Sequence, residues 1–230
     1  MAIRLHYVER GAGVPLVLLH GNGEDGSYFV HQMDYFSQQY RVIALDTRGH
    51  GKSPRGSAPF TLEQFAQDLK DTLDRLGLTR VLLLGFSDGA NIALIFTLRW
   101  PQYVEKLVLN GGNLDPKGVK WSVQLPICMG YRLVCLLEAI DRRAWPKREL
   151  LELMVKQPNL RPGQLSAILC PTLVVAGERD IIRGEHTVCI ARSIPGAELA
   201  ILPGNHFLAH QNSGPFNRRV EDFLQKGGCP

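Results

Sequence analysis

The sequence lacks long apolar runs, paired cysteines and a strong excess of charge of either sign. No apolar stretch approaches the ~20 residues that span a bilayer, so we expect no membrane partner. The cysteines form no CxxC pair and show no metal-ligand spacing, which argues against a metal site and favours reduced thiols in the cytoplasm. Met1 to Arg10 has neither the apolar core nor the cleavage site of a signal peptide, which also favours the cytoplasm. The five cysteines are Cys128, Cys135, Cys170, Cys189 and Cys229.

The net charge of +4 is small and unevenly distributed. Residues 111–171 contain nine Lys or Arg and five Asp or Glu, so the remainder of the chain is neutral. No basic tract carries interleaved aromatic residues, so we expect no nucleic-acid partner. The uneven charge instead marks residues 111–171 as a distinct region.

The 230 residues, 45% of them hydrophobic, suffice for one domain that needs no disulfides. Short apolar runs recur, and they are continuous rather than alternating, as in strands buried on both faces of a parallel sheet. Amphipathic stretches lie between them, the clearest running from a capping pair at Thr61 and Gln64 to a stop at Gly77. This pattern predicts an α/β fold, a mostly parallel sheet with helices on both faces. The runs are Leu16–Leu19, Val42–Leu45, Val81–Leu84, Leu107–Leu109, Leu173–Ala176 and Leu199–Leu202, preceded by a strand-like run at Ile3–Val8.

The alternation of strands and helices stops at Gly111 and resumes after about Ser166. Helical patches occur near Ile127–Ile140 and Lys147–Lys156, and no strand is evident. Roughly 55 residues are too many for a simple connection in this fold class, where loops of about 2–6 residues are typical. We therefore predict a small helical lid at residues 111–166, inserted into a core formed by residues 1–110 and 167–230.

Three polar residues follow three of these strands in the order serine, aspartate, histidine. Ser87 lies in a Gly-x-Ser-x-Gly turn between a strand and a helix, and Asp180 and His206 follow later strands. Ligands of such sheets bind at the carboxyl ends of the strands, where all three residues would meet. We expect Ser87 to be a nucleophile, His206 its base and Asp180 the acid that orients the imidazole. Asp115 remains the alternative acid, because it follows an earlier strand.

An oxyanion hole requires backbone N–H groups beside the nucleophile. His20-Gly21-Asn22-Gly23 forms a glycine-rich turn after the first long strand, and Asp88 opens the helix after Ser87. We expect the N–H groups of Asn22 and Asp88 to hold the oxyanion, with Gly23 as the second choice in the turn.

Together these motifs resemble the α/β-hydrolase superfamily over nearly the whole chain. Asp46–Ser53 (DTRGHGKS) resembles that family's D-x-R-G-x-G-x-S loop, which implies a structural role and no catalytic role for Arg48 or His50. The resemblance implies a carboxylesterase-like serine hydrolase that needs no metal and no organic cofactor. One departure is that a single strand-like run precedes Leu16, so the family's leading hairpin is shortened.

The expected substrate is a small ester or thioester cleaved through an acyl-enzyme. On the same triad, the alternatives are a carbon–carbon bond hydrolase or a cofactor-free peroxidase; a non-catalytic binding protein of the same fold is a further alternative. A dehalogenase is disfavoured because its nucleophile would be aspartate. The sequence leaves the oligomeric state open.

Two sets of residues are candidate substrate contacts. Asp88 is either a helix-start carboxylate stabilised by the helix dipole or an anchor for a substrate ammonium group. The positive charge of the lid favours anionic substrates instead. The apolar lid residues are expected either to contact the substrate or to pack the lid onto the core. They are Trp121, Leu125, Ile127, Met129 and Leu133.

Overall fold

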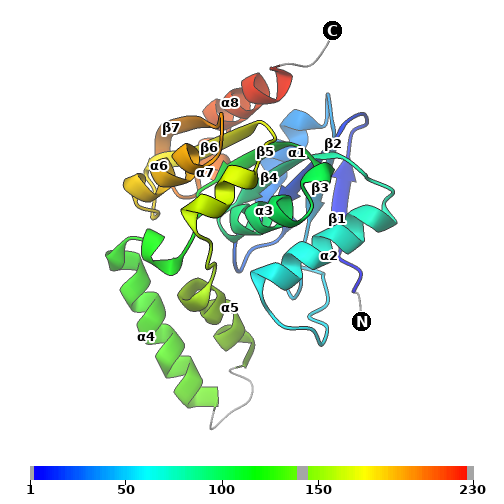
Figure 1. Cartoon of the computed structure of the whole chain (residues 1–230). Coiled ribbons are helices and arrows are strands. Elements are labelled where there is room, and N and C mark those ends of the chain that lie inside the picture. The colour runs from blue at the N-terminus through cyan, green and yellow to red at the C-terminus, as the bar shows by residue number, and fades with distance from the viewer. Residues whose placement is uncertain (1–2, 139–144, 227–230) are drawn as a thin grey trace.

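The structure is a computed structural model, and it describes residues 3–138 and 145–226. Its centre is a seven-stranded sheet in the order β1-β3-β2-β4-β5-β6-β7 (Figure 1). All neighbours are parallel except β1, which runs antiparallel to β3 at one edge. The strands are β1 (Tyr7–Arg10), β2 (Pro15–Leu19), β3 (Arg41–Leu45), β4 (Val81–Phe86), β5 (Val104–Asn110), β6 (Thr172–Arg179) and β7 (Glu198–Asn205).

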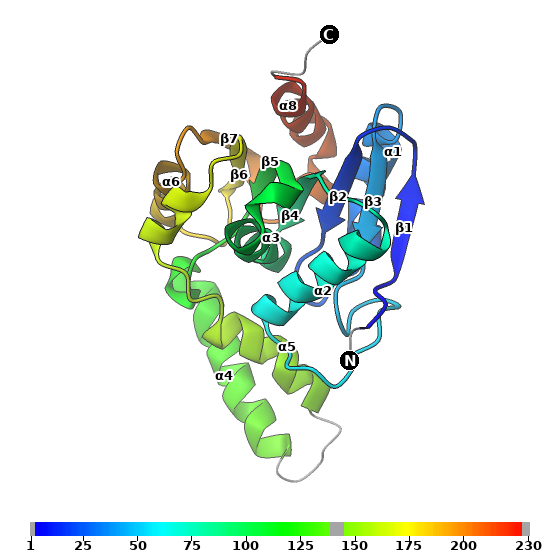
Figure 2. The same ribbon diagram turned by 45° about the vertical axis from the view of Figure 1, so that its right-hand side comes forward.

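Helices cover both faces of this sheet, as predicted. Buried side chains of α2, α3 and α6 form one core layer with the sheet, and those of α1, α7 and α8 form the other (Figure 2). The helices are α1 (Val30–Phe36), α2 (Leu62–Arg75), α3 (Asp88–Arg99), α4 (Trp121–Glu138), α5 (Trp145–Lys156), α6 (Gly184–Ser193), α7 (Leu208–Gln211) and α8 (Ser213–Gln225). Short 3₁₀ helices are η1 (Gly26–Phe29), η2 (Pro101–Tyr103), η3 (Pro116–Gly118) and η5 (Pro162–Ala167).

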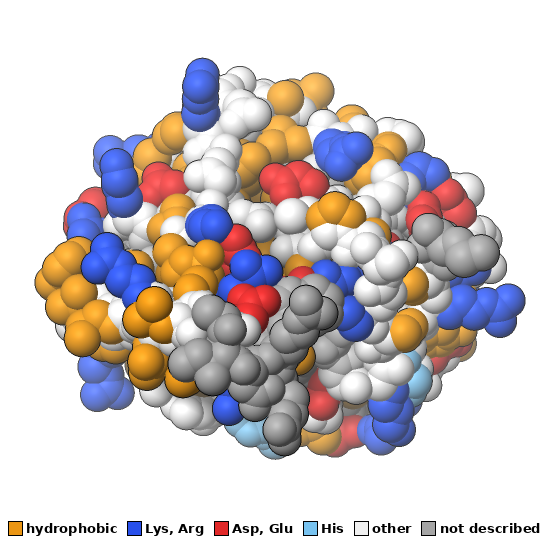
Figure 3. Space-filling model, turned by 90° about the horizontal axis from the view of Figure 1, so that it is seen from below, with side chains coloured by type: hydrophobic (Ala, Val, Ile, Leu, Met, Phe, Trp, Pro, Cys, Tyr) orange, Lys and Arg blue, Asp and Glu red, His pale blue; other side chains and the backbone are white. Residues whose placement is uncertain are grey.

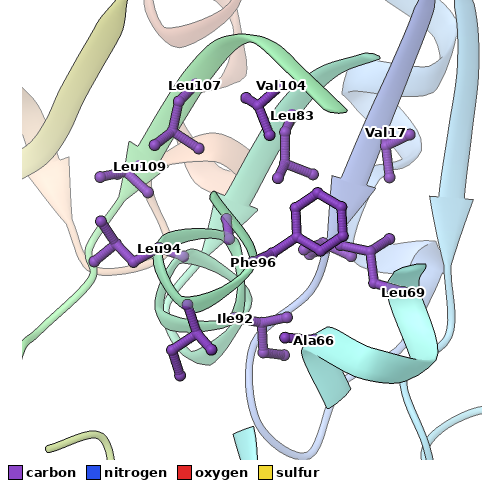
Figure 4. Packing of buried hydrophobic residues seen from close by; sticks show 14 of the residues in the cluster. Val17, Ala66, Leu69, Leu83, Ile92, Leu94, Phe96, Val104, Leu107 and Leu109 are labelled. Atoms are coloured by element: carbon purple, nitrogen blue, oxygen red, sulfur yellow. The ribbon is translucent and has the colours of Figure 1, made fainter. Parts of the chain in front are cut away.

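Five of the six predicted apolar runs are buried on both faces of the sheet because successive side chains of a strand point to opposite sides. The prediction was wrong for Leu199–Leu202, because β7 is an edge strand in which Leu199 and Ile201 are exposed. Val17 and Leu19 of β2 belong to the core layer of α2 and α3, whereas Leu16 and Leu18 belong to the opposite layer. Figure 4 shows Phe96 of α3 packed between the sheet and α2. The sheet and α3 are therefore packed tightly, and the residues of the candidate site lie at the carboxyl ends of the strands and at the start of α3.

Helix α2 begins and ends where its sequence signals predict. The Thr61 side chain accepts a hydrogen bond from the backbone N–H of Gln64 (3.2 Å), and Gly77, with φ +66°, follows the C-cap residue Leu76. The Gln64 side chain does not complete the capping box but donates to Asp68 (3.0 Å). Asp68 in turn pairs with the fully buried Arg48 (2.6 Å), which gives Arg48 a structural role.

The N-terminal strand is displaced from its predicted position. We expected it at Ile3–Val8, but pairing with β3 begins only at Tyr7 and continues to Arg10. Leu5 is instead buried in the core and Ile3 packs against it, so these apolar side chains belong to a segment that precedes the strand. The prediction was wrong because apolar residues before a strand resemble the strand itself.

The described part of residues 111–166 contains helices and no strand. Helices α4 and α5 pack against each other and project below the sheet in Figures 1 and 2. An antiparallel bridge between Val119 and Ile182 joins the segment to the core, and an ion pair between Arg55 and Glu149 is a further link between them. Ala139 and Ile140, at the end of the first predicted helical patch, lie outside the described residues. The role of this segment as a lid stays a prediction.

No helix in residues 3–138 and 145–226 is long and apolar enough to cross a membrane. Cys128, Cys135, Cys170 and Cys189 are free thiols, and Cys229 lies outside the described residues.

Candidate active site

Ser87 lies in a sharp turn between β4 and α3. Its backbone has φ +53° and ψ −119°, and it is the one residue other than glycine with positive φ in the described parts of the chain. Such strain persists only where the surroundings enforce it, and it is common at functional sites. A Cβ at Gly85 would lie 2.2 Å from the carbonyl oxygen of Gly89, and one at Gly89 would lie 2.0 Å from that of Leu19. The two glycines are thus required by close backbone approach.

The three residues predicted at the sheet edge form a hydrogen-bonded chain. His206 Nε2 lies 3.0 Å from Ser87 Oγ, and His206 Nδ1 lies 2.7 Å from Asp180 Oδ1. Each residue directly follows the carboxyl end of its strand: Ser87 follows β4, Asp180 follows β6 and His206 follows β7. Asp180 and His206 are almost fully buried. This arrangement suits proton transfer from the serine hydroxyl to an imidazole that a carboxylate orients.

Asp180 is held as a carboxylate. Burial acts to raise its pKa, but the His206 ring and the N–H groups of Ile182 and Gly177 lower the pKa below its ordinary value. The Ile182 N–H donates to Oδ1 (2.9 Å) and the Gly177 N–H donates to Oδ2 (3.4 Å). Asp115, the alternative acid, instead accepts from the N–H of Lys117 (2.7 Å) at the start of η3.

The glycine-rich turn after β2 is fixed from two sides. The His20 ring donates from Nδ1 to the Gly21 carbonyl (2.6 Å) and accepts at Nε2 from the Thr47 N–H (3.0 Å). Burial lowers the pKa of His20 to about 4, so this ring is neutral at pH 7. On the other side, the Glu24 carboxylate accepts from the Gly21 N–H (3.1 Å). The turn that contains Asn22 is therefore preorganised, as an oxyanion site requires.

Asp88 begins α3, so its backbone N–H is among those that lack a partner within the helix. Its side chain accepts from Asn91 Nδ2 (3.1 Å), and Asn91 also donates to Asn113 Oδ1 (3.0 Å). The second carboxylate oxygen, Oδ2, is buried and has no hydrogen-bond partner in the described part of the chain. Burial raises the pKa of Asp88 to about 6, against an ordinary value of 3.8. A buried carboxylate with so few hydrogen bonds suits a site that binds a hydrogen-bond donor of a ligand.

A small cavity of about 30 Å³ adjoins Ser87 and is lined by several buried acceptors. Asn22 Oδ1, Asp88 Oδ2 and Gln124 Oε1 have no hydrogen-bond partner among the described residues, and all three residues line this cavity. The amide nitrogens of Asn22 and Gln124 are used elsewhere, donating to the carbonyls of Leu150 (2.8 Å) and Met154 (3.1 Å). Unpaired buried oxygens are rare in folded proteins. Three residues with such an oxygen line this one cavity, which suits a ligand with several donors.

The apolar lid residues that we predicted as substrate contacts do not line this cavity. Trp121, Leu125, Met129 and Leu133 are exposed on α4, and Ile127 is half-buried. Figure 3 shows an apolar patch over α4 with Lys and Arg side chains around it. Among the described residues of α4, Gln124 is the one that lines the cavity at Ser87. The further lining residues that sequence reasoning missed are Asn113, Val119, Met154, Gln157, Ile181 and Ile182.

Nothing in the sequence around these missed residues distinguishes them, because they come from separate segments joined only by the fold. The one available signal was a glutamine in an otherwise apolar stretch, at Gln124.

No group of three or more His, Cys, Asp or Glu side chains in residues 3–138 and 145–226 could hold a metal ion.

Known proteins resemble this chain over most of its length. Residues 14–133 match the family model described as the α/β hydrolase fold. Serine hydrolase BPHL of Homo sapiens is 30% identical over 247 residues, covering 97% of this chain and 84% of that protein. The 2-hydroxy-6-oxononadienedioate/2-hydroxy-6-oxononatrienedioate hydrolase of Escherichia coli (strain K12 / DH10B) is 30% identical over 264 residues, covering 97% of this chain and 92% of that protein.

Solved structures share the fold as well. The structure of Est816, described as an N-acyl homoserine lactone degrading enzyme, superposes with a TM-score of 0.77 at 26% identity, covering 96% of this chain and 97% of that one.

Proposed function

The chain belongs to the α/β-hydrolase family and is a hydrolase, and on that premise we propose that it cleaves small esters or thioesters through an acyl-enzyme on Ser87. The observation that carries the proposal is the hydrogen-bonded chain from Ser87 through His206 to Asp180, beside a buried cavity. A cytoplasmic setting, expected from the unpaired cysteines, is part of the same proposal.

In the proposed reaction, Ser87 Oγ attacks the carbonyl carbon as His206 Nε2 takes its proton. The backbone N–H groups of Asn22 and Asp88 stabilise the oxyanion that forms. His206 then gives the proton to the leaving alcohol or thiol, and the acyl group remains on Ser87. Water, activated by His206, hydrolyses this acyl-enzyme and restores the serine. Asp180 keeps the imidazole oriented and stabilises its cationic form.

We also propose that the preferred esters carry a primary ammonium group next to the scissile carbonyl. An ammonium group has three N–H donors and no acceptor. The unpartnered oxygens of Asn22, Asp88 and Gln124 supply three acceptors, one of them on a carboxylate. A cavity of about 30 Å³ has room for one group of about the size of a water molecule.

A carbon–carbon bond hydrolase is the second candidate, because the E. coli relative is named as a hydrolase of an oxo-diacid. A binding protein that retains the triad is the third. The binding protein can be distinguished from an esterase by its behaviour toward an activated ester. An esterase forms an acyl-enzyme rapidly and then releases its product, whereas a binding protein sustains no turnover.

The test measures turnover of p-nitrophenyl esters and thioesters of graded chain length, with Ser87→Ala as the blank. A serine-directed phosphonate probe should label Ser87 in the wild type and leave Ser87→Ala unlabelled. Within the series, an α-amino acyl ester is compared with the matched ester that lacks the amine. We expect a kcat/KM at least tenfold higher for the amino ester, and Asp88→Asn should remove this difference.

Three results would contradict the proposal in different ways. Phosphonate labelling without sustained ester turnover would favour a binding protein. If the protein cleaved a diketone, with its two carbonyl groups conjugated through a carbon–carbon double bond, at a far higher rate than any ester, the carbon–carbon bond hydrolase would be favoured. If Asp88→Asn lowered kcat/KM equally for the amino ester and for the matched ester without the amine, Asp88 would be only a residue at the start of a helix.

A further inference from the structure

A second and much larger cavity lies against the one at Ser87. Its volume is about 670 Å³, and it lies between η3, α4, α5 and the loop before α6. Val119 and Gln124 line both cavities, so the two share a wall. Small-molecule sites usually have about 300–1,000 Å³, so this second cavity has room for the bulk of a substrate, whereas the cavity at Ser87 does not.

The larger cavity has apolar lining residues, including Trp121, one of the predicted substrate contacts, and its charged lining residues are mostly basic. Lys117, Lys156 and Arg183 contribute three cationic side chains, and Asp115 is the one acidic residue among the described lining residues. The Asp115 carboxylate already accepts from the backbone N–H of Lys117 (2.7 Å). Lys156 is paired with Glu152 one turn earlier in α5, on an exposed surface. No ion pair of Lys117 or Arg183 occurs among the described residues, so their charges are available.

The backbone brings Lys117 and Arg183 to the same cavity. The Arg183 N–H donates to the Gly118 carbonyl (2.8 Å), and the adjacent residues Val119 and Ile182 form the bridge between the lid segment and the core. The two charges therefore come from segments 66 positions apart that are hydrogen-bonded to each other. Lys156 comes from a third element, α5. Such convergence concentrates positive potential at one concave surface.

We propose that this cavity binds the alcohol portion of the substrate and that this portion carries an anionic group, a carboxylate or a phosphate. The inference rests on the proposed function: if the ammonium group fills the cavity at Ser87, the bulk of the substrate has to extend beyond Gln124, and the larger cavity there has room for the alcohol. The preferred substrate then has opposite charges at its two ends. The ammonium meets the oxygens around Asp88, and the anion meets Lys117 and Arg183.

This arrangement also explains how one site can carry a negative Asp88 and a positive lid. The two charges serve different ends of one ligand, so neither has to determine the sign of the whole substrate. Because the cationic side chains are exposed, their attraction is moderate and should weaken with salt, as the Debye length falls from ~30 Å at 0.01 M to ~10 Å at 0.1 M.

The experiment measures binding and turnover separately. Three alanyl esters of one aryl alcohol are compared, in which the ring carries a neutral, a carboxylate or a phosphate substituent at the same position. Calorimetry with Ser87→Ala gives Kd for each intact ester without hydrolysis, and kcat/KM is measured with the wild-type triad. Lys117→Gln and Arg183→Gln are made singly and together in both backgrounds. Lys120→Gln is the matched control, an exposed lysine near Lys117 that does not line the cavity.

We expect Ser87→Ala to bind at least one of the two anionic esters about tenfold more tightly than the neutral one at low salt. The double variant should lose most of this advantage and leave the neutral ester unchanged, while Lys120→Gln should change little. A larger gain for the phosphate than for the carboxylate would assign the group to a phosphate ester, and the reverse to a carboxylate.

Equal Kd values for all three esters would overturn the cavity assignment, even if the wild type hydrolyses all of them. An effect of Lys120→Gln as large as that of Lys117→Gln would also overturn it, because the attraction would then come from the overall charge of the lid. Selective binding without any hydrolysis by the wild type would instead overturn the proposed function and leave the cavity assignment standing.

Discussion

Replacing Asp88 with asparagine should make the protein more stable at neutral pH, although it removes a carboxylate from the first turn of a helix. The Asp88 carboxyl has a pKa of about 6 in the folded chain and an ordinary value of 3.8. The shift of about two units corresponds to about 3 kcal/mol at 1.36 kcal/mol per unit. Burial of one unpartnered carboxylate oxygen causes this, and it outweighs the helix dipole.

The pH dependence follows from the direction of the shift. Because the folded state holds the Asp88 proton more tightly, the wild type loses stability as the pH rises from about 4 to about 6. An asparagine does not titrate, and its Oδ1 can still accept from Asn91. The variant should therefore match the wild type near pH 4 and exceed it by about 2–3 kcal/mol at pH 7.

Urea denaturation at pH 4 and pH 7 measures both values. Glu63→Gln is the matched control, since Glu63 is an exposed carboxylate in the first turn of α2. There the helix dipole dominates, and the change should destabilise the fold by about 0.3–1 kcal/mol at pH 7. If Asp88→Asn behaved like Glu63→Gln, the interpretation of Asp88 as an uncompensated buried carboxylate would be refuted.

The other predictions concern activity. Ser87→Ala or His206→Ala alone should lower kcat by about 10⁴ to 10⁶, because the triad acts as a unit; a variant that kept a tenth of wild-type turnover would refute the assignment. Asp180→Asn should lower kcat by about 10⁴, whereas Asp115→Asn should change it little; the reverse outcome would move the acid to Asp115. In the wild type, the ratio of kcat/KM for an amino ester to that for its neutral analogue should rise between pH 5 and 7 as Asp88 ionises, and the ratio cancels any effect of pH that is common to both esters; a flat ratio would exclude Asp88 as the anchor.

The sequence determined the sheet and the positions of Ser87, Asp180 and His206, because these depend on local order. A strand buried on both faces needs a continuous apolar run, and the carboxyl ends of parallel strands share one edge. The Gly-x-Ser-x-Gly turn depends on close backbone contacts at Gly85 and Gly89, which only glycine tolerates. The apolar runs and the contact at Gly85 act within a few residues, and although Gly89 is required by its approach to Leu19, the glycine pattern itself is visible in the sequence.

Tertiary structure alone decided which side of α4 faces the site. The helix is apolar around most of its circumference, so its periodicity does not select a face. The packing of α4 against α5 turned Gln124 inward and left Leu125 and Met129 exposed. The unpartnered oxygens around Ser87 likewise depend on every neighbouring donor in the fold, and the basic cavity combines segments far apart in the chain. These properties depend on contacts between residues that are far apart in the chain. No local pattern in the sequence records such contacts.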